Sequence, residues 1–448
     1  MTIKDGPTDD RPLLLLITTG LRRWREYLLG SIASHFRVHL FLRAEPQWEL
    51  DYVTGWTVLP DTQDGPAMGR AALELAEKQP VAGVLCWDEG HIHTASYAAE
   101  ALGLRGGDPA VVWRVRDKGQ TRAALDAAGV PQPRSVPVNS LEEAVAAAER
   151  VGYPAILKPR GYGASLGVVR VEDEDELRER FPFTHDFTLP DPVPFNSPER
   201  VLVEECVIGD EISVDSVIRD GVVTALFVGR KVVGYPPYAE EIGHFVDAED
   251  PLLTDPVLTR ILQDTHAALG FRDGWTHSEF MLTTDGPKVI EVNGRLGGDM
   301  IPYLGKLATG IDPGPVAAAV ACGLEPDIAP TRSRVAAIRF YYVEEEDTTV
   351  GSISFDEDGL PPEIDKALTL IEPGAVVSPP PRGSVFQRIA LAIAVADSIE
   401  ACSRALDAAE PALKVTATAV GGKPVEPTLL DARPVTGVPG ARSVTHAE

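Results

Sequence analysis

The sequence predicts a protein of mixed α/β and α+β class with more than one domain. Short apolar strands alternate with helical stretches as far as about residue 110, a pattern typical of a parallel sheet covered by helices. Two apolar runs, 275–283 and 288–293, are joined by a turn and predict a hairpin. Beyond residue 330, strands and a single helix predict an α+β end. With 448 residues, the chain is long enough for two or three domains.

The first part of the chain is expected to hold the parallel sheet. His91 and His93 stand at the start of its third helix, where we expect a structural role. The polar ends of the chain, 1–11 and about 432–448, are expected to be disordered tails. The predicted strands are 13–18, 38–42, 56–59 and 81–86, and the predicted helices lie near 22–35, 66–78 and 93–102.

Two helices are predicted next. One covers 119–128, directly after Asp117 and Lys118, and the prolines of 130–133 end it. Lys118 is a candidate phosphate ligand, although a lone exposed lysine at this place is often simply solvated. Ser140 and Glu143 form a capping box that opens the second helix, 141–151.

A glycine-rich loop follows a short apolar strand that ends with Lys158 and Pro159. The loop, 161–167, contains three glycines and Ser165 and leads into a strand at 168–171. Its backbone amides can approach phosphate oxygens closely, although it matches neither the P-loop nor the dinucleotide-binding fingerprint. Alone it would be an ordinary hairpin turn, but a lysine at the end of a buried strand needs an anionic partner to stay charged. We therefore assign Lys158 and Ser165 to a phosphate site.

An apolar strand interrupted by acidic residues, 201–207, follows a Pro-rich loop at 189–198. This pattern is typical of a strand that forms the wall of an adenine pocket, in which Glu204 would accept a hydrogen bond from the exocyclic amine of adenine. It equally fits an edge strand whose polar residues face water. On the first interpretation, Glu204, Val207 and Glu211 belong to the nucleotide site.

The hairpin carries the most informative residues of the chain. With a period of two, Glu291 and Asn293 point to one face, and Glu279 can face them from the partner strand. Hard oxygen ligands of this kind suit Mg²⁺, which proteins hold by one or two carboxylates together with substrate phosphates. Arg295 offers paired donors to a phosphoryl or acyl oxygen. The alternative is a strand with a solvated acidic edge.

Taken in order, these elements resemble the ATP-grasp superfamily. The matching pieces are Asp117-Lys118, the strand before Lys158 with its glycine loop, 204–207, Glu279, and 291–295. The resemblance implies an ATP-grasp fold with an N-terminal Rossmann-like domain (1–112), a central lid subdomain (113–207), a catalytic domain with an α+β extension (208–431) and a tail (432–448). Within the superfamily the chain looks most like the carboxylase-related branch, and there like the L-amino acid ligases that make dipeptides.

The segment 231–247 is where this resemblance places substrate selection. It contains several prolines and is expected to be irregular. Glu241 and His244 match positions near the amino-acid site of the dipeptide ligases, although a single histidine in a loop is commonly just solvated. Asp299, four residues after Arg295, occupies the position that shapes the pocket for the first amino acid in this branch. The side chains that the segment 235–244 and Asp299 select are not determined by the sequence.

The reaction implied is amide-bond formation through an acyl phosphate, with ATP and Mg²⁺, for which Mn²⁺ can substitute. In this scheme Glu279, Glu291 and Asn293 hold the metal, and Lys118 and Lys158 hold phosphates. Arg295 steadies the acyl phosphate, while Glu241 and His244 act on the amino-acid substrate. The glycine loop would close as a lid against water. Three alternatives stay open: a biotin-carboxylase-like enzyme, a ligase that uses a different amine, and a non-catalytic ATP-binding module.

Composition limits the partners. The net charge of −26 and a pI near 4.7 argue against nucleic acid and anionic membranes. The four cysteines have no CxxC spacing, so disulfides and zinc sites are not expected. The N-terminus lacks a signal or membrane-spanning pattern. We expect a cytoplasmic protein that binds small molecules. A homodimer is possible.

Overall fold

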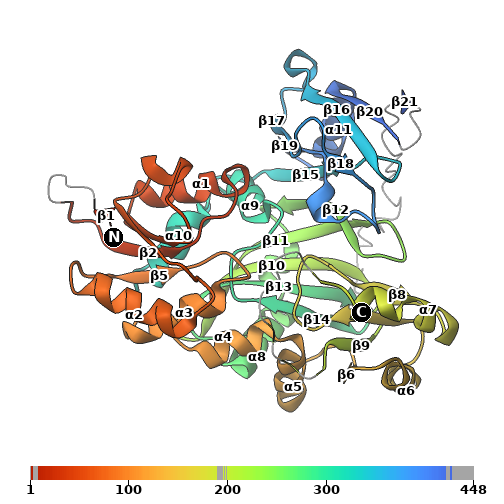
Figure 1. The fold of residues 1–448 in the computed structure, drawn as a ribbon, viewed down its shortest axis with the longest axis horizontal. Helices are drawn as coiled ribbons and strands as arrows, with labels where there is room; N and C mark the ends of the chain where they lie inside the picture. The colour runs from red at the N-terminus through yellow and green to blue at the C-terminus, as the bar shows by residue number, and fades with distance from the viewer. Residues whose placement is uncertain are drawn as a thin grey trace, which may run out of the picture.

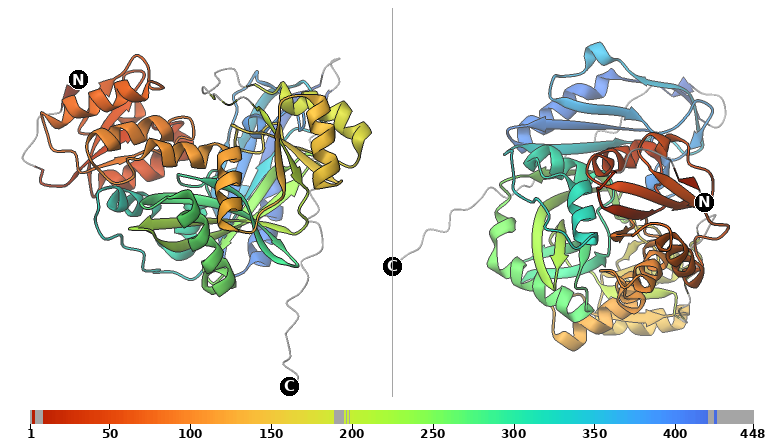
Figure 2. Two further views of the ribbon diagram at one scale, coloured as in Figure 1. Left: turned by 90° about the horizontal axis from the view of Figure 1, so that it is seen from below. Right: turned by 90° about the vertical axis from the view of Figure 1, so that its left-hand side faces the viewer.

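The computed structural model describes residues 2–3, 9–188, 195, 197, 199–419 and 424–425. The predicted tail at 432–448 and most of the Pro-rich stretch 189–198 lie outside these residues. The described chain forms four sheets (Figure 1). Seen from below, the N-terminal sheet with its helices and the second sheet lie on opposite sides, and the long central sheet connects them (Figure 2).

The N-terminal sheet has five strands in the order β1-β4-β3-β2-β5. Alternate side chains of β2 enter different cores: Leu14 and Leu16 pack with α1, whereas Leu15 and Ile17 pack with α2 and α3. Helices therefore cover both faces of a sheet whose strands β2 to β5 are parallel, as predicted. The elements are β1 Thr2–Ile3, β2 Leu13–Ile17, α1 Arg22–Ala33, β3 Arg37–Leu42, η1 Trp48–Asp51, β4 Gly55–Val58, α2 Gly65–Ala76, β5 Gly83–Leu85 and α3 Ile92–Ala101.

The expectation of a disordered tail at 1–11 is wrong in part. Thr2 and Ile3 form β1, which pairs antiparallel with Trp56 and Gly55 of β4. An edge strand offers unpaired backbone groups, and a short N-terminal segment satisfies them. Arg11 is also fixed, because its Nη1 donates to the carbonyl of Ala33 at 2.5 Å.

The second sheet has four antiparallel strands in the order β6-β9-β7-β8. Because β9 lies between β6 and β7, the interpretation of 201–207 as an edge strand is wrong. Ser140 caps α6, since its Oγ accepts from the amide of Glu143 at 3.2 Å, but the Glu143 carboxylate accepts from the amide of Asn139 rather than that of Ser140, so only one half of the predicted capping box is present. The elements are α4 Pro109–Arg116, α5 Lys118–Ala128, β6 Ser135–Val138, α6 Leu141–Val151, β7 Ala155–Pro159, β8 Val169–Val171, α7 Glu174–His185 and β9 Val201–Glu205.

The central sheet has eight strands in the order β14-β13-β10-β11-β12-β15-β19-β17. Helix α8 packs on one core and α9 and α10 on another, where they meet α1 of the N-terminal part. The elements up to residue 321 are β10 Asp210–Arg219, β11 Val222–Gly234, β12 Glu240–Asp247, η2 Pro251–Thr254, α8 Pro256–Leu269, β13 Gly274–Thr283, β14 Gly286–Asn293, α9 Ile301–Thr309 and α10 Pro313–Ala321.

The C-terminal part extends this sheet, because β15 pairs with β12. The predicted helix 398–413 ends earlier, at Ala409, since Pro411 cannot donate a helical hydrogen bond and Leu413 begins a strand. A four-stranded sheet, β18-β16-β20-β21, completes the fold. The elements are β15 Val335–Tyr341, β16 Thr348–Phe355, η3 Glu357–Gly359, β17 Ile364–Thr369, β18 Val376–Val377, η4 Val385–Gln387, β19 Ala390–Ala396, α11 Ile399–Ala409, η5 Glu410–Ala412, β20 Leu413–Thr418 and β21 Pro424–Val425.

The predicted domain boundaries stay a prediction. The chain passes from one sheet to another between β5 and β6 and between β9 and β10, and the last boundary, at 431/432, lies outside the described residues. In the described part of the chain, no helix is both long and apolar enough to cross a membrane. Cys86 and Cys402 are buried, whereas Cys206 and Cys322 are half-buried.

Candidate active site

The hairpin of β13 and β14 brings the predicted acidic residues together. In its register Glu279 pairs with Glu291 and His277 pairs with Asn293. The register shifts between Glu279 and Phe280, so the acidic pair stands beside a bulge. Directly opposite residues lie about 4.5–5.5 Å apart at Cβ, so the two carboxylates can share one cation. The predicted arrangement of these strands is therefore confirmed.

The segment 231–247 is regular, contrary to the prediction. It forms the end of β11 and all of β12, and the prolines are confined to the connection between the two strands. His244 is not a solvated loop residue: it pairs with Lys231 of β11 and Ile338 of β15, and it is 1% exposed. Strand pairing thus fixes both predicted substrate-side residues, Glu241 and His244.

Lys231 is the centre of this region, and sequence reasoning did not identify it. Its Nζ lies 2.7 Å from Glu211, 2.8 Å from Glu241 and 3.1 Å from Glu279, and its side chain is 2% exposed. Burial lowers the pKa of Lys231, but the three carboxylates outweigh burial and raise it well above the ordinary value. One ammonium therefore holds three acids from three strands in one place.

His277 links the hairpin to β10. Its Nδ1 lies 2.9 Å from Asp215 and its Nε2 lies 3.6 Å from Glu279. Burial disfavours the charged ring, but Asp215 raises the pKa of His277 to about 9. Asp215 also accepts from the amide of Gly297 at 2.9 Å. A Cβ at Gly297 would lie 2.8 Å from the His277 ring, so this contact requires glycine.

The residue predicted to shape the substrate pocket, Asp299, joins this network. Its carboxylate lies 2.7 Å from Arg388 Nη1 and 3.3 Å from His244 Nε2, and His244 lies 3.3 Å from Glu241. Burial opposes protonation of His244, but Asp299 and Glu241 outweigh it and raise the pKa of the ring. Arg388 also donates to the carbonyl of Glu241 at 2.7 Å. The C-terminal part therefore contributes Arg388, which sequence reasoning missed, to this network.

The nucleotide side contains two lysines in ion pairs. Lys158 lies 2.6 Å from Glu204, which also binds Arg122 Nε at 2.7 Å. Burial disfavours the charge of Glu204, but Arg122 and Lys158 lower its pKa to about 2. Lys118 lies 3.0 Å from Glu291 and donates to the carbonyl of Tyr162 in the glycine loop. The anionic partner that Lys158 requires is thus Glu204 in this structure.

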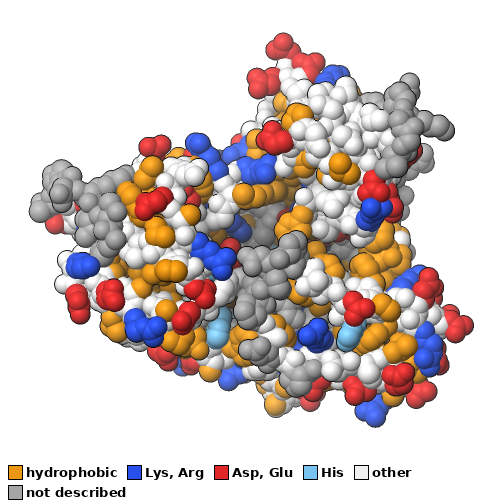
Figure 3. All heavy atoms as spheres, viewed as in Figure 1, with side chains coloured by type: hydrophobic (Ala, Val, Ile, Leu, Met, Phe, Trp, Pro, Cys, Tyr) orange, Lys and Arg blue, Asp and Glu red, His pale blue; other side chains and the backbone are white. Residues whose placement is uncertain are grey.

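These groups surround one cavity of about 150 Å³. The glycine loop forms one wall, where Ser165 has a φ of 53°, and the hairpin forms another. The surface of the molecule is hollowed between its parts on this face (Figure 3). The predicted residues that line the cavity are Lys118, Lys158, Ser165, Glu204, Val207, Glu211, Glu241, Glu279 and Glu291.

Arg295, beyond the end of β14, turns toward the N-terminal part. Its Nε lies 2.6 Å from Glu89, which follows β5 and also pairs with Arg116 at 3.3 Å. Burial lowers the pKa of Arg295, but Glu89 outweighs this and raises it. Glu89 is a further residue that sequence reasoning missed. Arg295 therefore stands between the hairpin acids and the N-terminal sheet.

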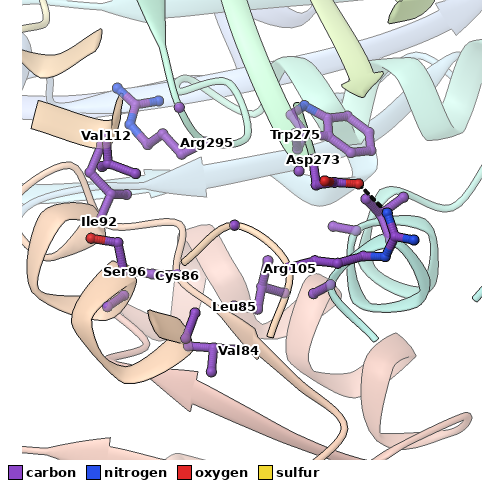
Figure 4. A pocket seen from close by; sticks show the side chains of 18 of the residues that line it. Val84, Leu85, Cys86, Ile92, Ser96, Arg105, Val112, Asp273, Trp275 and Arg295 are labelled. Atoms are coloured by element: carbon purple, nitrogen blue, oxygen red, sulfur yellow. Dashed lines mark hydrogen bonds and ion pairs between the residues drawn. The ribbon is translucent and has the colours of Figure 1, made fainter. Parts of the chain in front are cut away.

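A second cavity, of about 90 Å³, lies behind Arg295 (Figure 4). Arg295 and Val112 lie on one side of it, and the Arg105–Asp273 ion pair lies on the opposite side. Apolar residues from β5, α3 and α10 form part of its wall. We assign no chemistry to this cavity, because Arg295 is the one predicted site residue in its wall, whereas the predicted lysines and glutamates line the other cavity.

The charges around Lys231 fit a divalent cation. Four carboxylates, those of Asp215, Glu211, Glu241 and Glu279, lie around Lys231 and His277, and His244 lies beside Glu241. Buried negative charge in excess of its counter-ions favours a bound cation, and carboxylate oxygens are the ligands that Mg²⁺ prefers. The predicted ligands Glu279, Glu291 and Asn293 stand beside this excess. Among the described residues, Glu241, His244 and Asp299 also bring ligand atoms within 4.8 Å of one another.

Glu240, the neighbour of Glu241, yields a prediction about stability. It is 7% exposed and accepts from the hydroxyl of Tyr342. Burial raises the pKa of Glu240 to about 7, from 4.5. The folded state therefore holds this proton more tightly, so the contribution to stability is complete below pH 4.5 and is lost as the pH rises through 7.

Glu240→Gln is expected to raise the melting temperature at pH 8.5 and to change it little at pH 5. The shift corresponds to on the order of 3 kcal/mol between these limits. Thermal unfolding followed by circular dichroism measures it, with the exposed Glu357→Gln as the matched control. Equal stabilisation by Glu240→Gln at both pH values would show that Glu240 is ionised throughout.

Comparison with known proteins finds relatives in sequence and in fold. Residues 151–303 match the family model of an ATP-grasp domain. An uncharacterized protein of Sinorhizobium fredii is 28% identical over 397 residues, which cover 87% of this chain and 79% of that protein. Alanine–anticapsin ligase of Bacillus subtilis is 28% identical over 230 residues, which cover 47% of this chain and about half of the ligase, 48%.

The crystal structure of L-amino acid ligase from Bacillus licheniformis has the same fold. It superposes with a TM-score of 0.74 at 23% identity and covers 91% of this chain and 99% of that ligase. The chain therefore has the ATP-grasp fold and carries an ATP-grasp domain. The ATP-grasp fold predicted from the sequence is confirmed.

Proposed function

We propose that the chain is an ATP-dependent carboxylate–amine ligase that joins two amino acids, or an amino acid and another amine, and releases ADP and phosphate. One observation carries this proposal: the cavity between the glycine loop and the hairpin is lined both by the phosphate-type lysines Lys118 and Lys158 and by the carboxylates Glu241 and Glu279. A nucleotide and a small polar substrate can meet there. The names of the relatives support the same reaction.

The nucleotide end is suited to phosphoryl transfer. Lys118 and Lys158 would bind the phosphates of ATP, and their present partners, Glu291 and Glu204, keep both ammonium groups in place before ATP arrives. Glu279, Glu291 and Asn293 would hold Mg²⁺, which Mn²⁺ can replace. When bound, this ion neutralises charge on the transferring phosphate. The glycine loop would cover the cavity and exclude water from a reactive acyl phosphate.

The substrate end is suited to an amino acid. Burial disfavours the charge of Glu241, but Lys231 and His244 outweigh it and lower the pKa of that carboxyl, so it stays ionised. An ionised buried carboxylate attracts the ammonium of a substrate. Arg295, between the hairpin and Glu89, would bind the acyl phosphate and the oxyanion formed when the amine attacks.

A screen of phosphate release from ATP across pairs of amino acids tests the proposal. Release is expected only when both members of a productive pair are present, because each amino acid alone supplies no second reactant. Release without any amino acid would indicate a simple ATPase. Nucleotide binding by calorimetry with no turnover for any pair would indicate a binding module instead.

Glu241→Ala and His244→Ala are expected to raise the KM of an amino-acid substrate at least about tenfold, which corresponds to about 1.4 kcal/mol. The affinity for ATP should stay nearly unchanged, since the two side chains stand at the substrate end. Steady-state kinetics with each substrate varied in turn measures this. The opposite pattern, a weakened affinity for ATP with an unchanged amino-acid KM, would move β12 to the nucleotide side.

A further inference from the structure

Arg25 is a half-buried arginine whose guanidinium has no partner in the described part of the chain. No hydrogen bond or ion pair joins it to any of the residues that the structure describes. The arginines around the candidate site behave differently, because each is paired with a carboxylate. These are Arg116 and Arg295 with Glu89, Arg122 with Glu204, and Arg388 with Asp299. None of its nitrogens is a buried atom without a partner, so the guanidinium reaches solvent and is available to an anion from solution.

The place of Arg25 in the fold is one where ligands bind. It lies in the first turn of α1, directly after β2, and β2 pairs with β3 and β5. Helix α1 packs on one face of this sheet and α3, after β5, packs on the other. The connections after β2 and β5 therefore diverge, and in open α/β sheets such a crevice at the carboxyl ends of the strands receives ligands.

The charged groups near Arg25 do not neutralise it, so an anion can bind there. They are those of Arg295, Asp88 and Asp299, and burial together with the charge of Arg295 lowers the pKa of Arg25. Neither acid is free to pair with it. Asp88 pairs with His91 at 3.2 Å and accepts from the amide of Gly90, and Asp299 is held by Arg388 and His244.

The helix itself adds positive potential. The N-terminus of α1 has no acidic residue in its first turn, and its N-cap residue, Leu21, makes no side-chain hydrogen bond. Basic residues are unfavourable at the positive end of the helix dipole. Arg22 pairs with Glu26 at 2.7 Å, and Arg23 donates to the carbonyl of Leu370 at 2.7 Å, so Arg25 is the arginine of this turn that is left without an acceptor.

Trp24, the residue before Arg25, packs toward the substrate end of the site. Trp24 lies 6.5 Å from Phe340, measured between ring centroids, and Phe340 lies 6.1 Å from His244 and 3.7 Å below the guanidinium of Arg388. In the space-filling view, basic side chains gather beside α1 at the rim of the hollow (Figure 3). Arg25 does not line the nucleotide cavity, so an anion bound to it would be away from the phosphates of ATP.

We propose that Arg25 binds a substrate carboxylate that is not phosphorylated, and that the amine partner of the reaction is therefore an amino acid or peptide with a free carboxylate. This inference rests on the proposed function. Arg25 would set the specificity for the acceptor, while Arg295 serves the carboxylate that is activated. A simple amine, or an amino acid with a blocked carboxylate, lacks the group that Arg25 recognises.

The test compares how tightly the full-chain protein binds free amino acids and the corresponding amino-acid amides. Equilibrium binding by calorimetry, in the presence of ADP and Mg²⁺, needs no turnover and uses each amino acid of the panel and its amide as probes. For productive pairs, the KM values of the acceptor and of its amide are measured as well. The variants are Arg25→Met and Arg25→Lys, and Arg22→Met on the same helix is the matched control.

The parent and Arg22→Met are expected to prefer the free amino acid over its amide at least about tenfold. Arg25→Met should lose that preference while its affinity for the amide is unchanged, and Arg25→Lys should retain part of it. An unchanged preference in Arg25→Met, or equal use of acids and amides by the parent, overturns the inference even if ligation is observed. If no amino acid binds the parent, both the inference and the proposed function fail.

Discussion

Glu291→Gln is expected to abolish phosphate release while leaving the fold intact. The substitution keeps the size of the side chain but removes one of the two carboxylates that face each other across the hairpin, and it also releases Lys118 from its ion pair. Loss of metal stabilisation should raise the barrier by about 3–4 kcal/mol, which is a loss of on the order of 100-fold to 1000-fold in rate.

A coupled phosphate assay at saturating Mg²⁺ measures this effect. Asp285→Asn is the matched control, because Asp285 is exposed in the turn of the same hairpin and the change of charge is the same. The control should turn over like the parent. Normal phosphate release by Glu291→Gln would remove Glu291 from the metal site.

Lys158→Ala is expected to weaken ATP binding and to slow turnover by on the order of 100-fold, because a fixed cation beside the phosphates serves both the ground state and the transition state. The fold should persist, since Glu204 keeps its two hydrogen bonds to Arg122, at 2.7 and 3.1 Å. Burial lowers the pKa of Lys158, although Glu204 partly offsets this, so the ammonium depends on an anion at this place.

Nucleotide affinity by calorimetry and turnover by steady-state kinetics test the role of Lys158. Lys288→Ala removes the same charge from a half-buried lysine that pairs with the neighbouring Glu205 at 3.3 Å, and it should have little effect. If Lys158→Ala binds and turns over ATP like the parent, Lys158 only completes the buried pair with Glu204.

Local patterns in the sequence were sufficient for the hairpin and for the N-terminal sheet. Alternation along 275–283 and 288–293 fixes which side chains share a face, so the pairing of Glu279 with Glu291 could be predicted. The strand after the glycine loop and the helix that begins at Leu141 have similarly local signals. These elements depend on periodicity and capping, which a sequence displays directly.

The β11–β12 pair was missed because prolines between two strands obscured their alternation. Pro236 and Pro237 lie in the connection, where they break no ladder, yet they made the whole segment look irregular. Lys231, which lies in β11, was missed for the same reason. The sequence Gly-Tyr-Pro-Pro-Tyr between two apolar runs is the signal of a turn that could have identified both strands.

The long-range partners could not have been predicted from the sequence. Glu89 reaches Arg295 from the N-terminal sheet, and Arg388 reaches Asp299 from the strand region at the other end of the chain. Each pair joins residues that are far apart along the chain, and nothing in the local pattern around Glu89 or Arg388 indicates a functional position. Only the packing of the parts brings them to the site.

Transfer of an oxygen atom from the substrate carboxylate to phosphate tests the central claim most directly. The protein would be incubated with ATP, Mg²⁺, the acceptor and an amino acid whose carboxylate is labelled with ¹⁸O. Mass spectrometry would then determine the masses of the products. An acyl phosphate requires that one labelled oxygen appears in inorganic phosphate, together with ADP and a condensed product lighter than its two substrates by one water. Labelled AMP with pyrophosphate, or unlabelled phosphate with a carboxylated product that depends on bicarbonate, would contradict the account.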